Sequence, residues 1–385
     1  MFQTLVASSV FWEFPFGEAL VLARPDLQGL FLLNYTSRLI WSATNQGIPV
    51  HSLAQQFSVD FNIPVSQAAH DIQTTLDSWS TGLFSRFSSP ITPDVSPFAP
   101  DSNFQLYSLG NYLLGDKRLR LEVADREFAE EIAPRLAHLR SEDTQTPDVT
   151  FQVARLNGCL KLFNSGVFFA EELEVNAARA VLLQELAHVA QPDADWLTIL
   201  HAGACGTGTA CVVMPADTNA GKTTLTAALM HSGLQFFSDD SAAVDRHTMR
   251  VAPMPFALMI REGSWPVLAS RFPELASAPV LERNGCNVRF LTPPSSQPGS
   301  GVPAKCLLFI EFKPGAATTL EPLTPFESLL RLQKSGFWVA HDRDSIGMFL
   351  SWLQSIPAYQ AIYSDLDEAT ALVHRLLAGS LPVAE

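Results

Sequence analysis

The chain has 385 residues, of which 47% are hydrophobic and 17% carry a charge. This composition is typical of folded globular proteins and excludes a chain that is disordered throughout. The net charge of −14 opposes binding to nucleic acid or to an anionic membrane surface, because both are themselves negative. No run approaches the roughly 18 apolar residues of a membrane-spanning helix, and the first residues lack the basic segment of a secretory signal.

The cysteines predict a reducing compartment. They are odd in number, widely spaced and without the paired spacing of metal ligands: Cys159, Cys205, Cys211, Cys286 and Cys306. Thiols in this pattern are expected to stay reduced and mostly buried, so we expect a cytoplasmic protein.

Residues 1–84 predict a small domain of short strands followed by three helices. Short apolar segments, typical of strands, occur at residues 11–14, 19–24 and 29–34. Three segments with helical periodicity come next. They begin after a capping residue at Asn34 or Thr36 and are separated at Gly47 and Pro64. This order favours a winged helix-turn-helix fold.

Winged helices often bind DNA, but the charge of residues 1–84 opposes that function. The segment holds two arginines, no lysine and six acidic residues, for a net charge of −4. A protein that binds the phosphate backbone needs the opposite sign. We therefore expect neither nucleic acid nor a membrane as a partner.

Residues 85–103 are rich in serine and proline, which predicts a linker between two domains. The second domain, residues 104–385, is expected to combine helices with a mixed sheet in an α/β (α+β) fold. Its first part, residues 104–198, predicts hairpins and two helices. The remainder, residues 199–385, follows a pattern of strand, loop, helix and strand that suits a nucleotide-binding core.

A phosphate-binding loop is predicted between the strand ACVVMP and the helix that ends at Gly233. The sequence Gly221-Lys222-Thr223 matches the end of the form Gly-x4-Gly-Lys-Ser/Thr, in which backbone N–H groups surround an anion at a helix N-terminus. Ala216 and Asn219 replace two expected glycines. Asn is the residue that best tolerates a left-handed backbone after Gly, whereas Ala216 adds a methyl group at the mouth of the loop.

Two adjacent carboxylates follow the next predicted strand. Asp239 and Asp240 come seventeen and eighteen residues after Lys222. Phosphoryl transfer needs magnesium against the phosphates and a base on the acceptor hydroxyl, and two neighbouring acids can divide these tasks. The alternative is a polar exit from the strand, with Asp240 capping a turn.

Together these segments resemble the HPr kinase/phosphorylase superfamily, in its branch of HPr-kinase-related serine kinases. The matching text is LHAGA at 200–204, ADTNAGKTT at 216–224, GLQFFSDD at 233–240 and PMPFALMIREGSW at 253–265. The resemblance implies the mixed sheet shared with phosphoenolpyruvate carboxykinases. The arginine-glycine signature of true HPr kinases is absent, so HPr itself is not the expected substrate.

The resemblance implies ATP and Mg²⁺ as cofactors and assigns roles to residues. Lys222 would bind the β- and γ-phosphates, and Thr223 would ligate magnesium. Asp239 would be the catalytic base with Asp240 nearer the metal, or the two acids would exchange these roles. The residues expected to contact the nucleotide are Ala216, Asp217, Thr218, Asn219, Ala220, Gly221, Lys222, Thr223, Thr224 and Arg261.

Two of these assignments keep an alternative. His201 matches the family's active-site histidine, or it is a strand histidine whose hydrogen bonds are satisfied by its neighbours. Arg261 contacts phosphate, or it is an ordinary exposed arginine.

Residues 1–84 resemble PqqD-type domains, which recognise leader peptides in ribosomal peptide pathways. The matching text is GEALVLARPDLQGLFLLNYTSRLIW, followed by helices containing SLAQQF and DIQTTLDSW. The resemblance implies that a precursor peptide binds by strand addition. The expected edge is residues 30–33 and the expected helix is residues 66–79.

The leading hypothesis is an ATP-dependent kinase that phosphorylates a hydroxyl, expected to be serine, on a peptide recruited by the first domain. The pair of domains implies tailoring of a lasso-type or related ribosomal peptide. One alternative is a pseudokinase that acts as a peptide-binding chaperone. Another is a kinase for a small hydroxylated metabolite.

Overall fold

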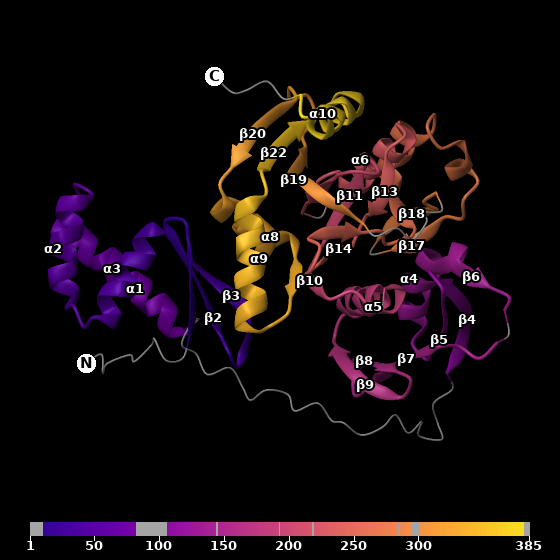
Figure 1. Ribbon diagram of the computed structural model, residues 1–385, viewed down its shortest axis with the longest axis horizontal. Coiled ribbons are helices and arrows are strands. Elements are labelled where there is room, and N and C mark those ends of the chain that lie inside the picture. The colour runs from indigo at the N-terminus through magenta and orange to yellow at the C-terminus, as the bar shows by residue number, and fades with distance from the viewer. Residues whose placement is uncertain are drawn as a thin grey trace. The chain divides into compact units, whose positions relative to one another are not determined.

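The computed structural model describes residues 11–81, 106–143, 145–191, 193–217, 219–283, 285–294 and 301–380. It combines helices with several separate sheets (Figure 1), so the predicted mixed α+β fold class is confirmed. The predicted linker, residues 85–103, lies outside the described residues. No helix in the described ranges is both long and apolar enough to cross a membrane.

The chain divides into two compact units that do not coincide with a simple cut along the sequence. The first unit contains Met1–Thr92 together with Pro325–Leu330 and Ala340–Leu353, and the second contains the rest. The sequence analysis places both of the later segments in the domain of residues 104–385, whereas in the structure they pack with the N-terminal residues.

The first unit begins with an antiparallel sheet of order β1-β2-β3, followed by three helices in the predicted order. Asn34 caps the first helix, because its side chain accepts a hydrogen bond from the Ser37 N–H at 2.9 Å. The elements are β1 (Trp12–Phe16), β2 (Ala19–Arg24), β3 (Leu27–Leu33), α1 (Tyr35–Asn45), α2 (Val50–Asp60) and α3 (Val65–Thr81).

Both faces of this small sheet are covered. Leu20 and Leu22 pack in a core with the three helices, and the alternate residues Val21 and Ala23 are completely buried on the other face. That face carries α9 (Arg343–Ser355), seen beside β2 and β3 in Figure 1. A Cβ on Gly347 of α9 would lie 3.6 Å from the ring of Phe14 in β1.

His341, just before α9, fixes the same contact. Its Nε2 lies 2.6 Å from the backbone oxygen of Arg24, and its ring lies 5.8 Å from that of Trp12. The start of α8 (Pro325–Ser335) also belongs to this unit.

The second unit contains three sheets, two of which frame the site. The six-stranded sheet has the order β6-β4-β5-β7-β8-β9. Helices α4 (Arg126–Leu136) and α5 (Val175–Ala190) share its apolar core. Its strands are β4 (Tyr107–Leu114), β5 (Lys117–Val123), β6 (Arg140–Ser141), β7 (Val149–Leu156), β8 (Cys159–Asn164) and β9 (Val167–Glu172).

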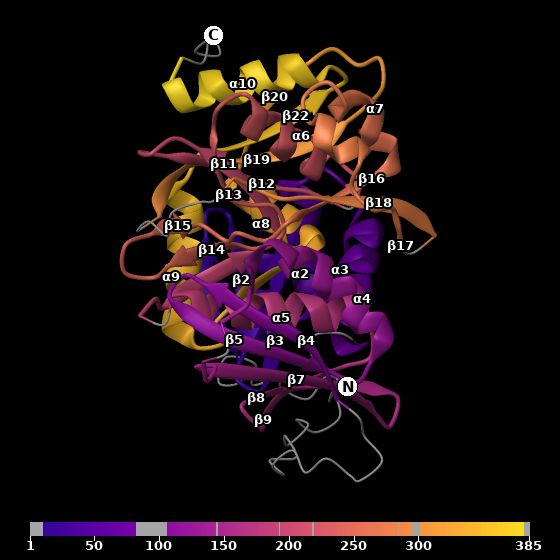
Figure 2. The same ribbon diagram turned by 90° about the vertical axis from the view of Figure 1, so that its right-hand side faces the viewer.

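A ten-stranded mixed sheet forms the centre of the second unit, with the path β13-β11-β12-β19-β15-β14-β10-β21; β22 also pairs with β19, and β20 pairs with β22. Helices α6 (Lys222–His231) and α10 (Leu366–Ala378) share a core with strands β12, β19 and β22, and α10 lies along the top of Figure 2. The strands are β10 (Trp196–Leu200), β11 (Ala202–Gly206), β12 (Cys211–Pro215), β13 (Gln235–Ser238), β14 (Ala242–Asp245), β15 (Arg250–Ala252), β19 (Val302–Phe312), β20 (Thr319–Leu323), β21 (Phe337–Val339) and β22 (Ala358–Tyr363).

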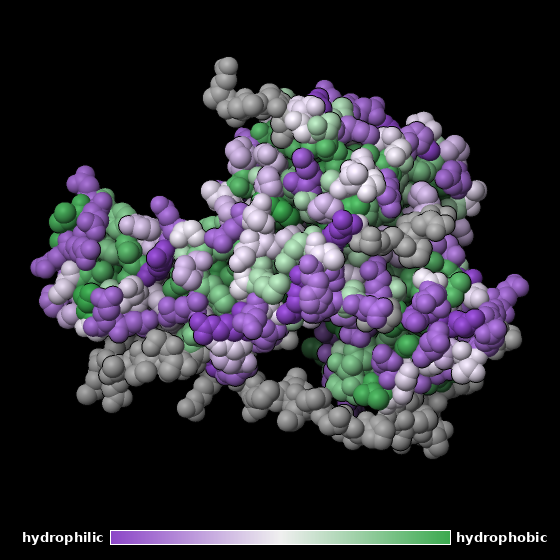
Figure 3. Space-filling view, viewed as in Figure 1, coloured by the Kyte–Doolittle hydropathy of each residue, from purple (hydrophilic) through white to green (hydrophobic). Residues whose placement is uncertain are grey.

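The third sheet is small and has the order β16-β18-β17, formed by β16 (Leu258–Arg261), β17 (Leu281–Arg283) and β18 (Cys286–Leu291). The short helix α7 (Trp265–Leu268) follows β16. On the outer surface, polar and apolar side chains are mixed (Figure 3), and an apolar group lies over β8 and β9, where Val167 is 62% exposed.

We predict that residues 1–92 do not fold stably by themselves, because without α9 the face that holds Val21 and Ala23 would meet water. Circular dichroism and thermal unfolding should show a cooperative transition only when residues 324–354 are joined to the fragment. A fragment of residues 1–92 that melts cooperatively as a monomer would contradict the packing described for α9.

Candidate functional site

The loop between β12 and α6 contains two residues with a left-handed backbone. Asn219 has a φ of 70° and Gly221 a φ of 92°, so Asn219 adopts the conformation that asparagine tolerates best after glycine. Glycine is also required at position 221 for space, since a Cβ there would lie 2.5 Å from the hydroxyl of Tyr363.

Ala216 does not obstruct the loop. It is 5% exposed and belongs to the apolar core beneath α6, and it is not among the described residues with positive φ. Its methyl group therefore packs into the protein. Neither replacement of glycine conflicts with the geometry of the loop.

Strand directions bring the loop, the two acids and His201 to one edge of the central sheet. β11 runs antiparallel to both β12 and β13, with Ala202 opposite Pro215 and Ala204 opposite Ser238. The carboxyl ends of β12 and β13 therefore lie beside the start of β11. His201, immediately before β11, is held there by a hydrogen bond from its N–H to the Gly336 carbonyl at 3.0 Å.

Lys222 contacts both acids, and Thr223 contacts Asp239. The Lys222 ammonium donates to the Asp239 carbonyl and lies 3.0 Å from Oδ1 of Asp240. The Thr223 hydroxyl donates to Oδ2 of Asp239 at 2.9 Å. The second oxygen of Asp239 is buried and has no hydrogen-bond partner among the described residues, which is an unusual state for a polar atom.

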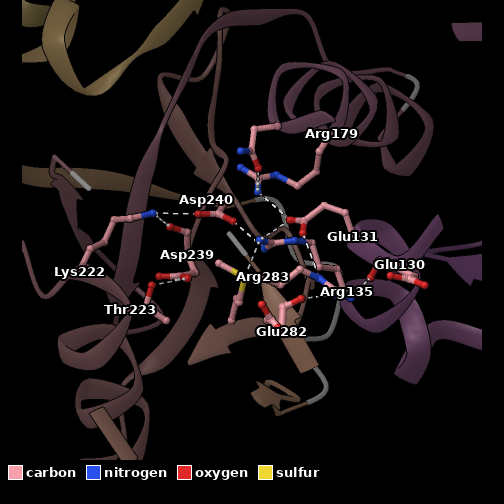
Figure 4. A network of polar contacts seen from close by, with 12 residues as sticks. Glu130, Glu131, Arg135, Arg179, Lys222, Thr223, Asp239, Asp240, Glu282 and Arg283 are labelled. Atoms are coloured by element: carbon pink, nitrogen blue, oxygen red, sulfur yellow. Dashed lines mark hydrogen bonds and ion pairs between the residues drawn. The ribbon is translucent and has the colours of Figure 1, made fainter. Parts of the chain in front are cut away.

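A second cation reaches Asp240 from the other side. Nη1 of Arg135, on α4, donates to Oδ2 of Asp240 at 2.7 Å, and the Arg135 side chain is only 2% exposed. Arg135 also contacts Glu131, which pairs with Arg179 at 2.8 Å and with Arg283 at 3.3 Å. Figure 4 shows this network extending from Lys222 through Asp240 to the three arginines.

The sequence analysis missed the contribution of α4, although the helix contains a signal. Phe128, Ile132 and Leu136 form its buried stripe, and Glu131 and Arg135 lie in the same stripe. Two charges four residues apart on an apolar face are rarely buried without a specific partner. That pattern predicts a polar contact, but it does not identify Asp240 as the partner.

The environment shifts the pKa values of the two acids in opposite directions. Burial raises the pKa of Asp239, and the positive charge of Lys222 offsets only part of that effect. Burial alone would also raise the pKa of Asp240, but Lys222 and Arg135 outweigh it and hold this pKa well below its usual value. Asp240 is therefore ionised at neutral pH.

His201 is electrostatically part of the same group. The charge of Lys222, followed by burial, lowers the pKa of His201 to about 4. The imidazole is therefore neutral at neutral pH and can accept or donate a hydrogen bond there.

The remaining predicted residues lie around the loop. Arg261 donates to the side chain of Asn219. Asp217 forms an exposed ion pair with Lys334.

Three further positions complete the predicted set. The Thr224 hydroxyl lies 2.6 Å from that of Ser264. The Ala220 carbonyl accepts the Phe312 N–H at 3.1 Å. Thr218 lies outside the described residues.

The acids could hold a metal only with help from a ligand. Within the described part of the chain, no group of three or more His, Cys, Asp or Glu side chains is arranged to bind a metal ion. Mg²⁺ commonly binds through one or two carboxylates and completes its shell with water and substrate phosphates. The unpartnered oxygen of Asp239, beside the Thr223 hydroxyl, fits that mode of binding.

No protein-family model matches the chain, and no match was found among curated proteins. Function therefore has to be inferred from the residues and their geometry.

We predict that replacing His201 removes part of the acid sensitivity of the fold. The pKa of His201 falls from 6.5 in the unfolded chain to about 4 in the folded one, so the unfolded state binds more protons between these values. The free energy of unfolding should fall by up to about 3 kcal/mol as the pH drops through this window. In His201→Gln this contribution should be absent.

Urea unfolding at pH 7.5 and pH 4.5 measures this difference. His247→Gln is the matched control, because that side chain is 72% exposed. Equal pH dependence in wild type and His201→Gln would contradict the placement of His201 beside Lys222.

We further predict that Asn219→Ala destabilises the protein by about 1–2 kcal/mol, whereas Asn219→Gly has a small effect. An alanine must adopt a left-handed backbone at a cost that glycine does not incur. Thermal unfolding of both variants measures the difference. Alanine and glycine variants of equal stability would show that position 219 is not held at positive φ.

Proposed function

We propose that the second unit is an ATP- and Mg²⁺-dependent kinase, related to the HPr-kinase-related serine kinases, that phosphorylates a hydroxyl group. The observation that carries the proposal is a loop ending in Gly221 whose Lys222 and Thr223 contact two adjacent carboxylates at the end of a neighbouring strand. Phosphoryl transfer depends on positioning and on charge around the phosphates. Here the Lys222 ammonium, the carboxylates of Asp239 and Asp240, and the backbone N–H groups at the start of α6 lie close together.

In the proposed function, the loop and the start of α6 hold the phosphates. The first N–H groups of a helix have no partner within the helix and point toward an anion. Lys222 would leave Asp240 and bind the β- and γ-phosphates. Lys222 is 8% exposed, so a phosphate replaces one buried anionic partner with another.

The structure supports a division of the two acids in which Asp239 is nearer the metal. Asp239 has the Thr223 hydroxyl on one oxygen and no partner on the other, so Thr223 and Asp239 would hold Mg²⁺. The bound ion would neutralise charge on the phosphates. The family resemblance gives Asp239 as the base and Asp240 as the residue nearer the metal; here the two acids exchange these roles.

Asp240 would then accept the proton of the acceptor hydroxyl. Its pKa lies well below the usual value because Lys222 and Arg135 outweigh the effect of burial, so it is available as a carboxylate at neutral pH. His201, neutral at that pH, would orient the acceptor by hydrogen bonding. Asp240 follows the end of β13, and His201 precedes the start of β11, which lies beside the ends of β12 and β13.

We propose that the first unit is a PqqD-like domain that recruits the substrate as a precursor peptide. β3 lies at one edge of the described three-stranded sheet, and an edge strand can accept a further strand from a peptide. Residues 30–33 of β3 and residues 66–79 of α3 would form the binding surface. The product would be a phosphorylated peptide of a ribosomal, lasso-type pathway.

A pseudokinase that only holds the peptide, or a kinase for a small metabolite, is the alternative. Ala216 and Asn219 were the sequence support for a loop without catalytic function. Asn219 fits the backbone of the loop and Ala216 fits its packing. The two replacements therefore favour a loop that keeps its catalytic function over one that has lost it.

We predict that Mg-ATP raises the melting temperature of the protein and that the γ-phosphate is transferred to leader-bearing precursor peptides. Lys222→Ala should reduce transfer by roughly 100-fold or more, since it removes a charge that stabilises the phosphates. Radiolabelled ATP measures the transfer. Lys305→Ala, at an exposed position of β19, is the control and should transfer phosphate at the wild-type rate.

Two outcomes separate the alternatives. Stabilisation by Mg-ATP without transfer to any peptide would favour the pseudokinase. Transfer to small hydroxylated compounds but not to peptides would favour the metabolite kinase.

A further inference from the structure

Asp240 has two cationic partners, one on each carboxylate oxygen. Lys222, at the start of α6, lies 3.0 Å from Oδ1, and Arg135 lies 2.7 Å from Oδ2. Arg135 comes from α4, 105 residues before Asp240 in the chain. The two partners thus belong to different layers of the second unit, and Figure 4 shows them on opposite sides of the carboxylate.

Lys222 and Arg135 are expected to respond differently when a nucleotide binds. In the proposed function Lys222 turns to the phosphates and leaves Oδ1 of Asp240. A buried carboxylate without a partner is costly, and without Arg135 it would rotate toward solvent. Arg135 is then the cation that remains in contact with Asp240.

Arg135 is held in a way that suits this role. Its Nη2 lies 3.4 Å from Glu131, and its guanidinium lies over the ring of Phe290 at 5.7 Å from the centroid. Glu131 is itself fixed by Arg179 and Arg283. Because Glu131 is held by two further arginines and itself contacts Arg135, the Arg135 side chain has little freedom to move toward the phosphates with Lys222.

We propose that Arg135 is a positioning residue, which keeps Asp240 oriented toward the acceptor hydroxyl while Lys222 binds the phosphates. This inference rests on the proposed function of the site. A buried ion network is seldom required for stability, since apolar residues can often replace it. A fixed carboxylate orientation is something that apolar residues do not provide.

The test measures nucleotide binding and turnover separately, with Mg-ATP as the probe and transfer of the labelled γ-phosphate to a leader-bearing precursor peptide as the readout. In Arg135→Gln, kcat should fall by roughly 100-fold, the range expected for loss of a positioned base, whereas the Kd for Mg-ATP should change less than about threefold. A general loss of structure would weaken both quantities. Arg283→Gln is the matched control, because it also removes a guanidinium from Glu131 but does not contact Asp240.

A double-variant cycle adds a second criterion. If Arg135 acts through Asp240, then Arg135→Gln combined with Asp240→Asn should be no slower than Asp240→Asn alone. Arg135→Lys keeps the buried charge and should fold, but a single ammonium cannot bridge both Asp240 and Glu131 as the planar guanidinium does. We expect its kcat to lie about tenfold below the wild type.

The outcomes distinguish this inference from the proposed function. A wild-type protein that does not transfer the γ-phosphate of Mg-ATP, whether or not it binds the nucleotide, would overturn the proposed function. A wild-type protein that turns over, with Arg135→Gln at the same kcat or with the effects of Arg135→Gln and Asp240→Asn fully additive, would overturn the positioning role alone. If Arg135→Gln does not fold, Arg135→Lys decides, and a wild-type kcat in that variant overturns the inference.

Discussion

The arrangement of the site depends on one interaction, the pairing of the Asp240 carboxylate with Lys222 and Arg135. The Lys222 and Arg135 side chains are 8% and 2% exposed, and Asp240 is 17% exposed. Charges this well buried persist only when they are paired. The start of α6, the end of β13 and helix α4 are therefore fixed relative to one another by a single carboxylate. Displacing any one of the three would break at least one of these two ion pairs.

This pairing gives the six-stranded sheet and its helices a part in the site. Residues 104–198 could be regarded as a spacer between the recognition region and the nucleotide-binding core. However, α4 supplies Arg135 and Glu131 and α5 supplies Arg179, all within the network around Asp240. The central sheet contributes the loop and the acids, because β12 and β13 end at the same edge. The site is thus assembled by two layers of the second unit.

Local sequence patterns predicted much of this structure. A helix cap at Asn34 or Thr36, the tolerance of Asn219 for a left-handed backbone and the acids after β13 all follow from properties of residues near one another in the chain. The partner of Arg135 and the packing of α9 on the first sheet could not be predicted in that way. Each depends on contacts between residues more than 100 positions apart, and amphipathic periodicity shows that a helix face is buried without showing against what.

The central claim is that a nucleotide phosphate takes the place of Asp240 as the partner of Lys222. A crystal structure with Mg²⁺ and a non-hydrolysable ATP analogue tests it most directly. We expect the Lys222 ammonium at about 3 Å from a phosphate oxygen, with the ion pair between Arg135 and Asp240 retained. A loop without nucleotide at saturating analogue, or a bound nucleotide with Lys222 still on Asp240, would contradict this account.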